Sequence, residues 1–147
     1  MPLDLPDDHC SFCDYLAGRR PYTILERTPL VALLVTYEQR GLGHVLAVPV
    51  EHRVTLLDLG PVEADAVMDA TVRASRAIAG AYDPPGIAVW QNNGRPAHQS
   101  VPHVHVHVAG TVPGGGTIWG DVPRSERAET EAIARRLAPH LDPPRTF

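Results

Sequence analysis

The sequence predicts a single α+β domain with a mainly antiparallel five-stranded sheet, one long helix and a C-terminal helix. Three observations lead to this prediction. The chain has 147 residues, the length of one domain and too few for two ordinary ones. Short apolar runs rich in β-branched residues stand on both sides of one long segment with helical spacing. Strands, a long helix, more strands and a final helix follow one another, which is the order of an α+β fold.

Three strands are expected before the long helix. Residues 1–9 hold two prolines and three aspartates, and we interpret them as a flexible arm. Residues 10–21 show no clean period, and Gly-Arg-Arg-Pro at 18–21 is typical of a turn. The strands are expected at residues 23–26, 31–37 and 44–48, the last of them after a Gly-Leu-Gly turn.

The long helix is expected to begin at Pro61. Proline suits a first helical turn, and Glu63 and Asp65 favour the positive end of the helix dipole. Apolar residues then recur three or four positions apart, at Val62, Ala66, Ala70, Ala74, Ala77 and Ala81. The sequence Asp-Pro-Pro-Gly at 83–86 ends the helix.

Two further strands are expected at residues 87–91 and 101–109, with the loop 92–100 between them. Residues 111–121 are rich in glycine, and a second helix is expected at 125–137. Residues 1–147 therefore form one domain in this interpretation. It comprises the arm 1–9, a core at 10–110, and a glycine-rich loop with the C-terminal helix at 111–147.

The composition excludes several function classes. All 13 basic residues are arginine, so Schiff-base chemistry, a pyridoxal-phosphate lysine, a Walker-A loop and a Ser-x-x-Lys nucleophile are excluded. A net charge of -4 argues against nucleic-acid binding. No apolar run approaches the roughly 20 residues of a membrane-spanning helix, and the acidic amino terminus is the reverse of a signal peptide. We expect a cytoplasmic protein that binds neither nucleic acid nor membranes and needs no organic cofactor.

Three of the eight histidines alternate with valine at His103, His105 and His107. On a strand, all three imidazoles would point to one face and the valines to the core. The outer two would lie about 13 Å apart at about 3.3 Å per residue, so the three cannot share one metal ion. They are therefore expected to have different roles. Neutral imidazole is a nucleophile and an acid–base group near pH 7. Amides and hydroxyls in the preceding loop, at Asn92, Asn93, Gln99 and Ser100, suit a phosphate.

The second candidate site is the pair Cys10 and Cys13. A Cys-x-x-Cys motif alone is compatible with a zinc site, a redox pair or coincidence. A redox pair requires a helix directly behind the motif and a thioredoxin-like order of strands, which the sequence does not show. Tetrahedral zinc requires two further ligands from elsewhere in the chain.

Residues 99–109, Gln-Ser-Val-Pro-His-Val-His-Val-His-Val-Ala, resemble the signature of the histidine triad superfamily. Outlying features agree, namely the paired cysteines, Gly43-His44, residues 48–52 (Val-Pro-Val-Glu-His) and Asn92-Asn93-Gly94. The resemblance covers residues 10 to 110. It is closest to the nucleoside phosphoramidase and dinucleoside polyphosphate hydrolase branches, and it implies their fold and a homodimer.

The resemblance implies a nucleotide hydrolase or nucleotidyl transferase that acts at the α-phosphate of a purine nucleotide or nucleotide conjugate. His105 would attack phosphorus and form a nucleotidyl-histidine intermediate. His107 would assist the leaving group and, with Asn92, Gln99 and Ser100, bind the phosphate. In the zinc-bearing branch of the family, the structural zinc ligands match Cys10, Cys13, His52 and His103. His44 is interpreted as a hydrogen-bonded structural histidine.

Two positions depart from the family pattern. Thr36 stands where an acidic residue usually holds the ribose, so this role would fall to Glu38 or a backbone group. His98 replaces the usual glycine before Gln99. Two alternative functions therefore stay open. One is a zinc hydrolase with His103 and His105 as metal ligands, and the other is a non-enzymatic nucleotide-sensing module with vestigial turnover. The substrate, the base and the leaving group do not follow from the sequence.

Overall fold

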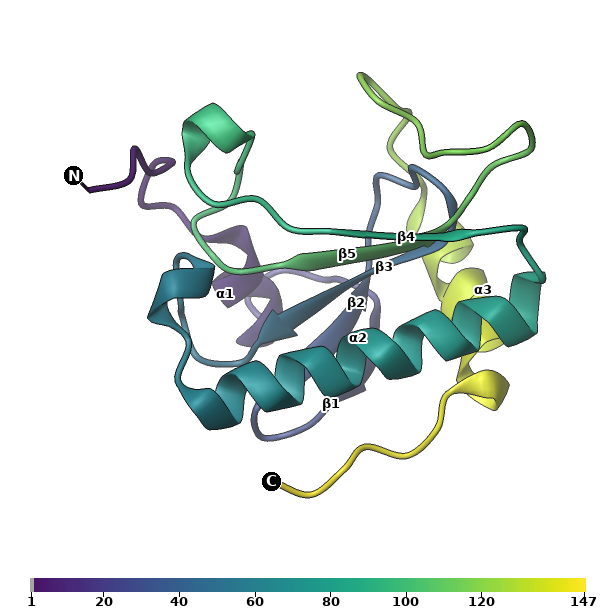
Figure 1. The fold of residues 1–147 in the computed structure, drawn as a ribbon, viewed down its shortest axis with the longest axis horizontal. Helices are drawn as coiled ribbons and strands as arrows, with labels where there is room; N and C mark the ends of the chain where they lie inside the picture. The colour runs from purple at the N-terminus through teal and green to yellow at the C-terminus, as the bar shows by residue number, and fades with distance from the viewer. Residues whose placement is uncertain (1) are drawn as a thin grey trace.

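The computed structural model describes residues 2–147 and forms one antiparallel sheet in the order β1-β2-β3-β5-β4 (Figure 1). The α+β prediction with five antiparallel strands and one long helix is confirmed. The strands are β1 (Ile24–Arg27), β2 (Val31–Val35), β3 (Leu42–Pro49), β4 (Ile87–Trp90) and β5 (Val106–Gly110). The helices are α1 (Ser11–Leu16), α2 (Pro61–Tyr82) and α3 (Arg127–Leu137), with single 3-10 turns at Leu56–Asp58, Arg95–Ala97 and Ala138–His140.

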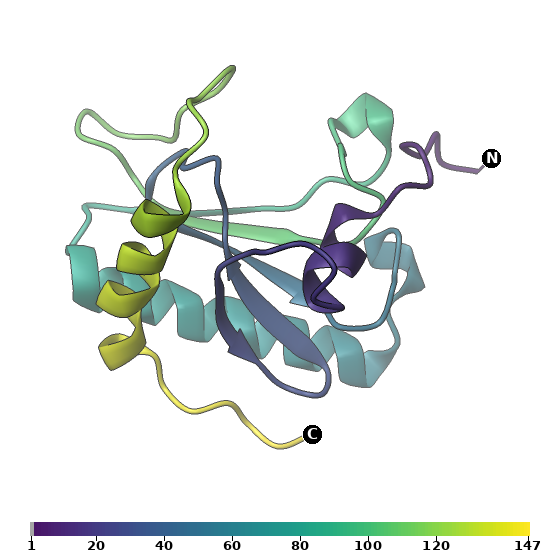
Figure 2. The same cartoon turned by 180° about the vertical axis from the view of Figure 1, so that it is seen from behind.

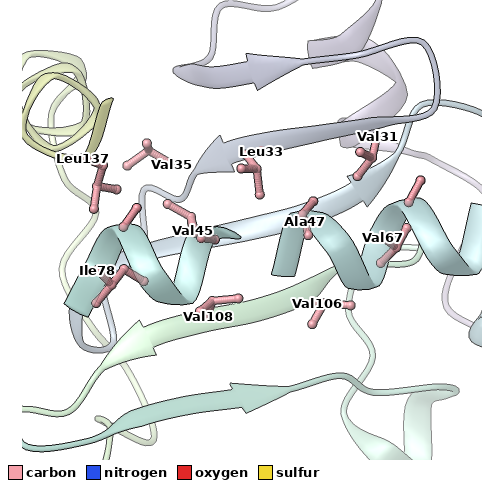
Figure 3. Packing of buried hydrophobic residues seen from close by; sticks show 14 residues of the cluster. Val31, Leu33, Val35, Val45, Ala47, Val67, Ile78, Val106, Val108 and Leu137 are labelled. Carbon is pink, nitrogen blue, oxygen red and sulfur yellow. The ribbon is translucent and has the colours of Figure 1, made fainter. Parts of the chain in front are cut away.

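Helix α2 packs along one face of the sheet and makes the larger core. Pro61 occupies its first turn as expected, and the Glu63 carboxylate accepts a hydrogen bond from the Gly60 N–H. The alanines of the predicted stripe are small, so the helix lies close to the strands. Figure 3 shows valines and leucines of β2, β3 and β5 meeting α2, with Leu137 of α3 closing one end.

The opposite face of the sheet is covered by α1, which the sequence did not predict (Figure 2). A six-residue helix is too short to display a period. Its signals are local: the Cys10 sulfur accepts a hydrogen bond from the Cys13 N–H, and Phe12 and Leu16 are buried one turn apart. These two side chains pack on Leu34 and Leu46 of the sheet in a second core.

The expected strand at 101–109 was predicted too long, since β5 begins only at Val106. Its neighbour β3 ends at Pro49, and the last register pair joins Ala47 to Val106. On the other side of β5 the pairing with β4 reaches only Trp90 and His107, and Pro102 has no N–H to donate. The Val104 N–H instead donates to the Arg53 carbonyl at 2.7 Å. His103 and His105 consequently lie on an extended loop, and only His107 lies on the strand.

The amino-terminal arm contacts the loop after β4. The Asp4 carboxylate accepts a hydrogen bond from Arg95 Nε at 2.9 Å, and the Asp4 carbonyl accepts one from the Arg95 N–H. Both cartoon views place the arm beside the Arg95–Ala97 turn (Figures 1 and 2). Within residues 2–147, no helix is long and apolar enough to cross a membrane.

Candidate active site and metal cluster

His105 is held with one ring nitrogen blocked and the other available. Its Nδ1–H donates to the His103 carbonyl at 2.7 Å, so the lone pair of the neutral ring lies on Nε2. The ring packs edge-on against Phe12 and is 7% exposed. This burial lowers the pKa of His105 below its ordinary value. A neutral imidazole with a free Nε2 has the properties of a nucleophile.

His107 is joined to a chain of hydrogen bonds that fixes its protonated nitrogen. The Arg40 N–H donates to His44 Nδ1 at 3.1 Å, so the proton of His44 lies on Nε2. That nitrogen lies 3.0 Å from His107 Nδ1 and donates to it. The neutral His107 ring therefore carries its proton on Nε2. Burial lowers the pKa of His44 to about 3 and that of His107 to about 2.

The indole of Trp90 stacks on His107, with ring centroids 4.7 Å apart and an angle of 4° between the planes. The contact follows from the sheet register, because Trp90 and His107 are cross-strand partners in β4 and β5. His44 reaches His107 from the other neighbouring strand, where Leu46 is the direct partner of His107. Both strands next to β5 thus hold the ring in place.

Two cavities meet at the histidines. The first, of about 230 Å³, is lined by four aromatic residues and by polar residues near the end of β2. The aromatic residues are Phe12, Tyr15, Tyr22 and Tyr37. The second, of about 450 Å³, lies between β4 and the glycine-rich loop. His105, His107, Ser100 and Glu38 line both cavities, so a ligand bound across the histidines would extend into each.

The loop 92–100 divides the predicted phosphate-binding residues into two groups. Ser100 lines both cavities and Asn92 lines the second. Gln99 is buried, and its amide is used within the loop. Its Oε1 accepts from the Gly94 N–H at 2.7 Å, and its Nε2 donates to the Val54 and Val101 carbonyls. In this structure Gln99 lines neither cavity and holds the shape of the loop beneath Ser100.

The four predicted metal ligands come together at the other end of the histidine segment. One ligand atom from each of Cys10, Cys13, His52 and His103 lies within 4.8 Å of the others. Cys13 Sγ lies 3.2 Å from His52 Nδ1, and Cys10 Sγ lies 3.4 Å from His103 Nδ1. A tetrahedral zinc with bonds of about 2.0–2.3 Å separates its ligand atoms by roughly 3.3–3.8 Å. The donor types and their spacing fit such a metal.

His103 is also oriented as a metal ligand. Its Nε2–H donates to the Pro49 carbonyl at 2.7 Å, which leaves the Nδ1 lone pair directed at the two sulfurs. Burial lowers the pKa of His103 to about 4 and raises that of the Cys10 thiol to about 12. A cation at this point favours the thiolate and compensates its burial. His105 is not among the residues that gather in this cluster.

Several residues around the histidines were not predicted to belong to the site. Trp90, Arg40 and the aromatic residues of the first cavity come from separate elements, and no local motif connects them. His44 was expected to be hydrogen-bonded and structural, and its bonds to Arg40 and His107 confirm this. Its contact with His107 required the register of β3 on β5, including the irregularity between Leu42 and Val45.

The chain matches the model of the HIT domain family over residues 18–113. An adenosine 5'-monophosphoramidase of Schizosaccharomyces pombe is 32% identical over 135 residues, which is 88% of this chain and 96% of that protein. The protein named hit of Bacillus subtilis is 29% identical, and the match covers 89% of this chain and 96% of that protein.

Solved structures agree in fold. A zinc-bound histidine triad family protein from Mycobacterium smegmatis has a TM-score of 0.75 and 26% identity, over 88% of this chain and 94% of its own. A Hit-like protein from Bartonella henselae has a TM-score of 0.86 and 21% identity, over 94% of this chain and all of its own. With the family match extending over well more than half of its residues, the chain belongs to the HIT domain family.

Proposed function

We propose that this chain is a nucleotide hydrolase or nucleotidyl transferase that works through a nucleotidyl-histidine intermediate on His105. The observation that carries the proposal is the hydrogen bond from His105 Nδ1–H to the His103 carbonyl, which leaves Nε2 unprotonated between two cavities. In the first step a bond forms between Nε2 and the α-phosphorus, and the bond to the leaving group breaks. In the second step water or another acceptor attacks phosphorus and releases the nucleotide from His105.

His107 is proposed to donate a hydrogen bond from its Nε2–H to the leaving group, which takes up its proton from water. Its Nε2 is the nitrogen that carries the proton, and the ring lines both cavities beside His105. An amine or alkoxide leaves slowly as an anion, so a hydrogen bond to the departing atom in the transition state speeds its departure. Ser100, which also lines both cavities, is proposed to bind a phosphoryl oxygen, with Asn92 at the edge of the second cavity.

The first cavity is proposed to hold the nucleoside, with a purine as its base. Four aromatic rings there offer flat apolar surfaces for a base to pack on. The Thr36 hydroxyl accepts a hydrogen bond from the Glu38 N–H, and both residues line the cavity. The Glu38 carboxylate is largely exposed and is paired with Arg40 at 3.3 Å. Thr36 carries no negative charge with which to bind the ribose hydroxyls. We assign that contact to the Glu38 carboxylate.

Cys10, Cys13, His52 and His103 are proposed to hold a structural zinc ion. Zinc would join α1 to the histidine segment and to the loop after β3 without entering the reaction. The zinc-bound relative from Mycobacterium smegmatis supports this choice of metal. The hypothesis of a zinc hydrolase using His105 is disfavoured by the composition of the cluster, which includes His103 and not His105.

We also propose that residues 1–147 act as one domain and pair as a homodimer through the β4 edge of the sheet. Val89 and Ile87 of β4, and Met68 and Val72 of α2, are large apolar side chains exposed to solvent. Val89 pairs with Val108, whose side chain lies in the α2 core, so β4 presents its apolar residues on the α2 side. An unpaired edge strand beside such residues suits pairing with a second copy.

The test of the proposed function is release of AMP from adenosine 5'-phosphoramidate by the wild-type chain and by His105→Ala. We expect turnover in the wild type and a loss of at least about 1,000-fold in the variant. Circular dichroism verifies that the variant is folded. An alkaline quench followed by intact-mass measurement should find an added nucleotidyl group in the wild type alone. Nucleotide binding with no turnover by either chain would favour the sensing module.

A further inference from the structure

A third cavity lies away from the histidines, beneath the C-terminal segment. Its volume is about 600 Å³, within the range of roughly 300 to 1,000 Å³ that holds small-molecule ligands. It is lined by the turn between β1 and β2, by one side of α2 and by residues 144–147, and both cartoon views place these segments side by side (Figures 1 and 2). It shares no lining residue with the two cavities at the histidines, so the proposed reaction makes no use of it.

Much of the wall of this third cavity is apolar and open to solvent. Val62 and Ala66 lie one turn apart on α2, Leu30 comes from the turn between β1 and β2, and Phe147 comes from the C-terminal segment. Val62 is 53% exposed and Phe147 is 44% exposed. Large apolar side chains left exposed around a hollow favour an apolar ligand, which would remove their surface from water.

Arg73 adds a buried charged group to the same wall. Its side chain is 3% exposed, Nε donates to the Asp69 carboxylate at 2.9 Å, and Nη1 lies 2.8 Å from Glu26 Oε2 and donates to the Asp142 carbonyl. Its Nη2 is buried and has no hydrogen-bond partner within residues 2–147. A buried donor without an acceptor costs free energy. Because Arg73 lines the cavity, an oxygen atom of a ligand there can supply the missing acceptor.

The charges around the cavity favour an anion with a single charge. Arg27 and Arg145 also line it, and neither guanidinium forms an ion pair within the described part of the chain. Three guanidinium groups, with that of Arg73, therefore face the two carboxylates of Asp69 and Glu26, which leaves one positive charge uncompensated. A monoanion would balance this charge, whereas an amine or a phosphate dianion would leave like charges together.

We propose that this third cavity binds a small monocarboxylate with an apolar body, of the size of a medium-chain acyl anion. The carboxylate would pair with Arg145 and accept a hydrogen bond from Arg73 Nη2. Arg145 is the freer of the two surface guanidiniums, since that of Arg27 already donates to the Leu16 carbonyl. The apolar body would pack on the α2 wall at Val62. The site is independent of the proposed nucleotide reaction.

The experiment is isothermal titration calorimetry of the whole chain with octanoate, kept below its micellar concentration. We expect one site, which binds octanoate at least about 50-fold more tightly than butyrate because four fewer methylene groups are buried. Octanoate should also bind about 10-fold or more tightly than octylammonium, which has the same chain and the opposite charge.

Variants on the wall locate the site. Arg145→Gln should weaken octanoate binding about 10-fold, whereas Arg135→Gln, at an exposed arginine of α3 outside the cavity, should not change it. Val62→Trp places a large ring at the cavity and should block binding. Leu57→Trp, at a residue that is 78% exposed and does not line the cavity, should bind as the wild type does. Circular dichroism verifies that each variant is folded.

Amide NMR spectra supply a readout that does not depend on any variant. Octanoate should shift the signals of Leu30, Val62 and Thr146, which all line the third cavity. Shifts confined to His105 and its surroundings, equal binding of octylammonium, or binding unchanged in Arg145→Gln would overturn the proposal. Binding to phosphatidylglycerol vesicles without binding of free octanoate would overturn it in favour of a lipid surface.

Discussion

The Nε2 atom of His44 lies 3.0 Å from the Nδ1 atom of His107, and the Arg40 N–H fixes the direction of the proton between them. His44 is thus a positioning residue that keeps the His107 proton on Nε2. His44→Phe removes the donor while retaining a flat ring. We expect kcat to fall about 10- to 100-fold with a smaller change in KM, as for loss of other orienting partners.

A substrate with a good leaving group tests this role directly. Adenosine 5'-(4-nitrophenyl phosphate) releases a phenolate that needs no proton, so His44→Phe should lose much less rate with it than with the phosphoramidate. An equal loss with both substrates, or a loss confined to KM, would show that His44 only maintains the shape of the site. His9→Phe, at an exposed histidine of the arm, is the matched control.

Stability is expected to fall in mild acid because His44 and His107 are buried as neutral rings. Their folded pKa values, about 3 and about 2, are below the ordinary value of 6.5. The unfolded chain therefore binds more protons below pH 6.5, and the stabilisation present above that pH is lost as the pH falls toward the folded values.

Between pH 7 and 5.5 the two groups together should reduce the free energy of unfolding by about 2 to 3 kcal/mol. Urea unfolding at several pH values measures this slope in the metal-loaded protein. His44→Phe should reduce the slope by about half, while His9→Asn should leave it unchanged. A slope that is the same in all three chains would contradict the assignment to these buried rings.

Much of the fold and of the candidate site follows from local patterns in the sequence. The alanine stripe and Pro61 predict α2 nearly to the residue. The ligand set Cys10, Cys13, His52 and His103 follows from the family resemblance and is brought together by the fold. What the sequence did not predict is α1, which is too short to display a period, and the start of β5, which depends on how far its pairing with β3 and β4 extends.

The partners of His107 illustrate the same limit at the level of chemistry. His44 and Trp90 meet its ring because their strands flank β5 in a particular register. Register is a property of the assembled sheet, and neither residue lies in a motif with His107. Gln99 shows the converse: a motif position expected to bind phosphate uses its amide within the loop, because three backbone groups lie within its reach.

Removal of the metal should affect stability more than chemistry. The purified chain is expected to contain about one zinc ion per molecule by elemental analysis, and Cys13→Ser should lose it. A chelator should lower the Tm of the wild type and leave the Tm of Cys13→Ser unchanged, since the variant has no site to empty. Turnover per folded molecule should persist. Complete loss of turnover with an unchanged Tm would favour the zinc hydrolase instead.

Gln99→Ala is expected to loosen the loop that carries Ser100. The change leaves the Gly94 N–H and the Val54 and Val101 carbonyls without the partners that Gln99 provides. Loss of such buried bonds should lower the free energy of unfolding by about 2 to 4 kcal/mol and raise KM for the nucleotide. Arg95→Ala, at an exposed position of the same loop, should lower the free energy of unfolding much less. Denaturant unfolding and steady-state kinetics measure both effects.

A charge on the β4 edge should separate the proposed homodimer. Val89 is half exposed on the α2 side of an edge strand. Val89→Glu would therefore place a carboxylate in an apolar interface. In the homodimer the new carboxylate of one copy would face the same carboxylate of the other. We expect the mass measured by light scattering to fall from twice the chain mass to the chain mass at micromolar concentration. Leu5→Glu, an exposed apolar position of the amino-terminal arm, should remain dimeric. A wild-type chain that is monomeric at that concentration, or a dimer unaffected by Val89→Glu, would exclude pairing through β4.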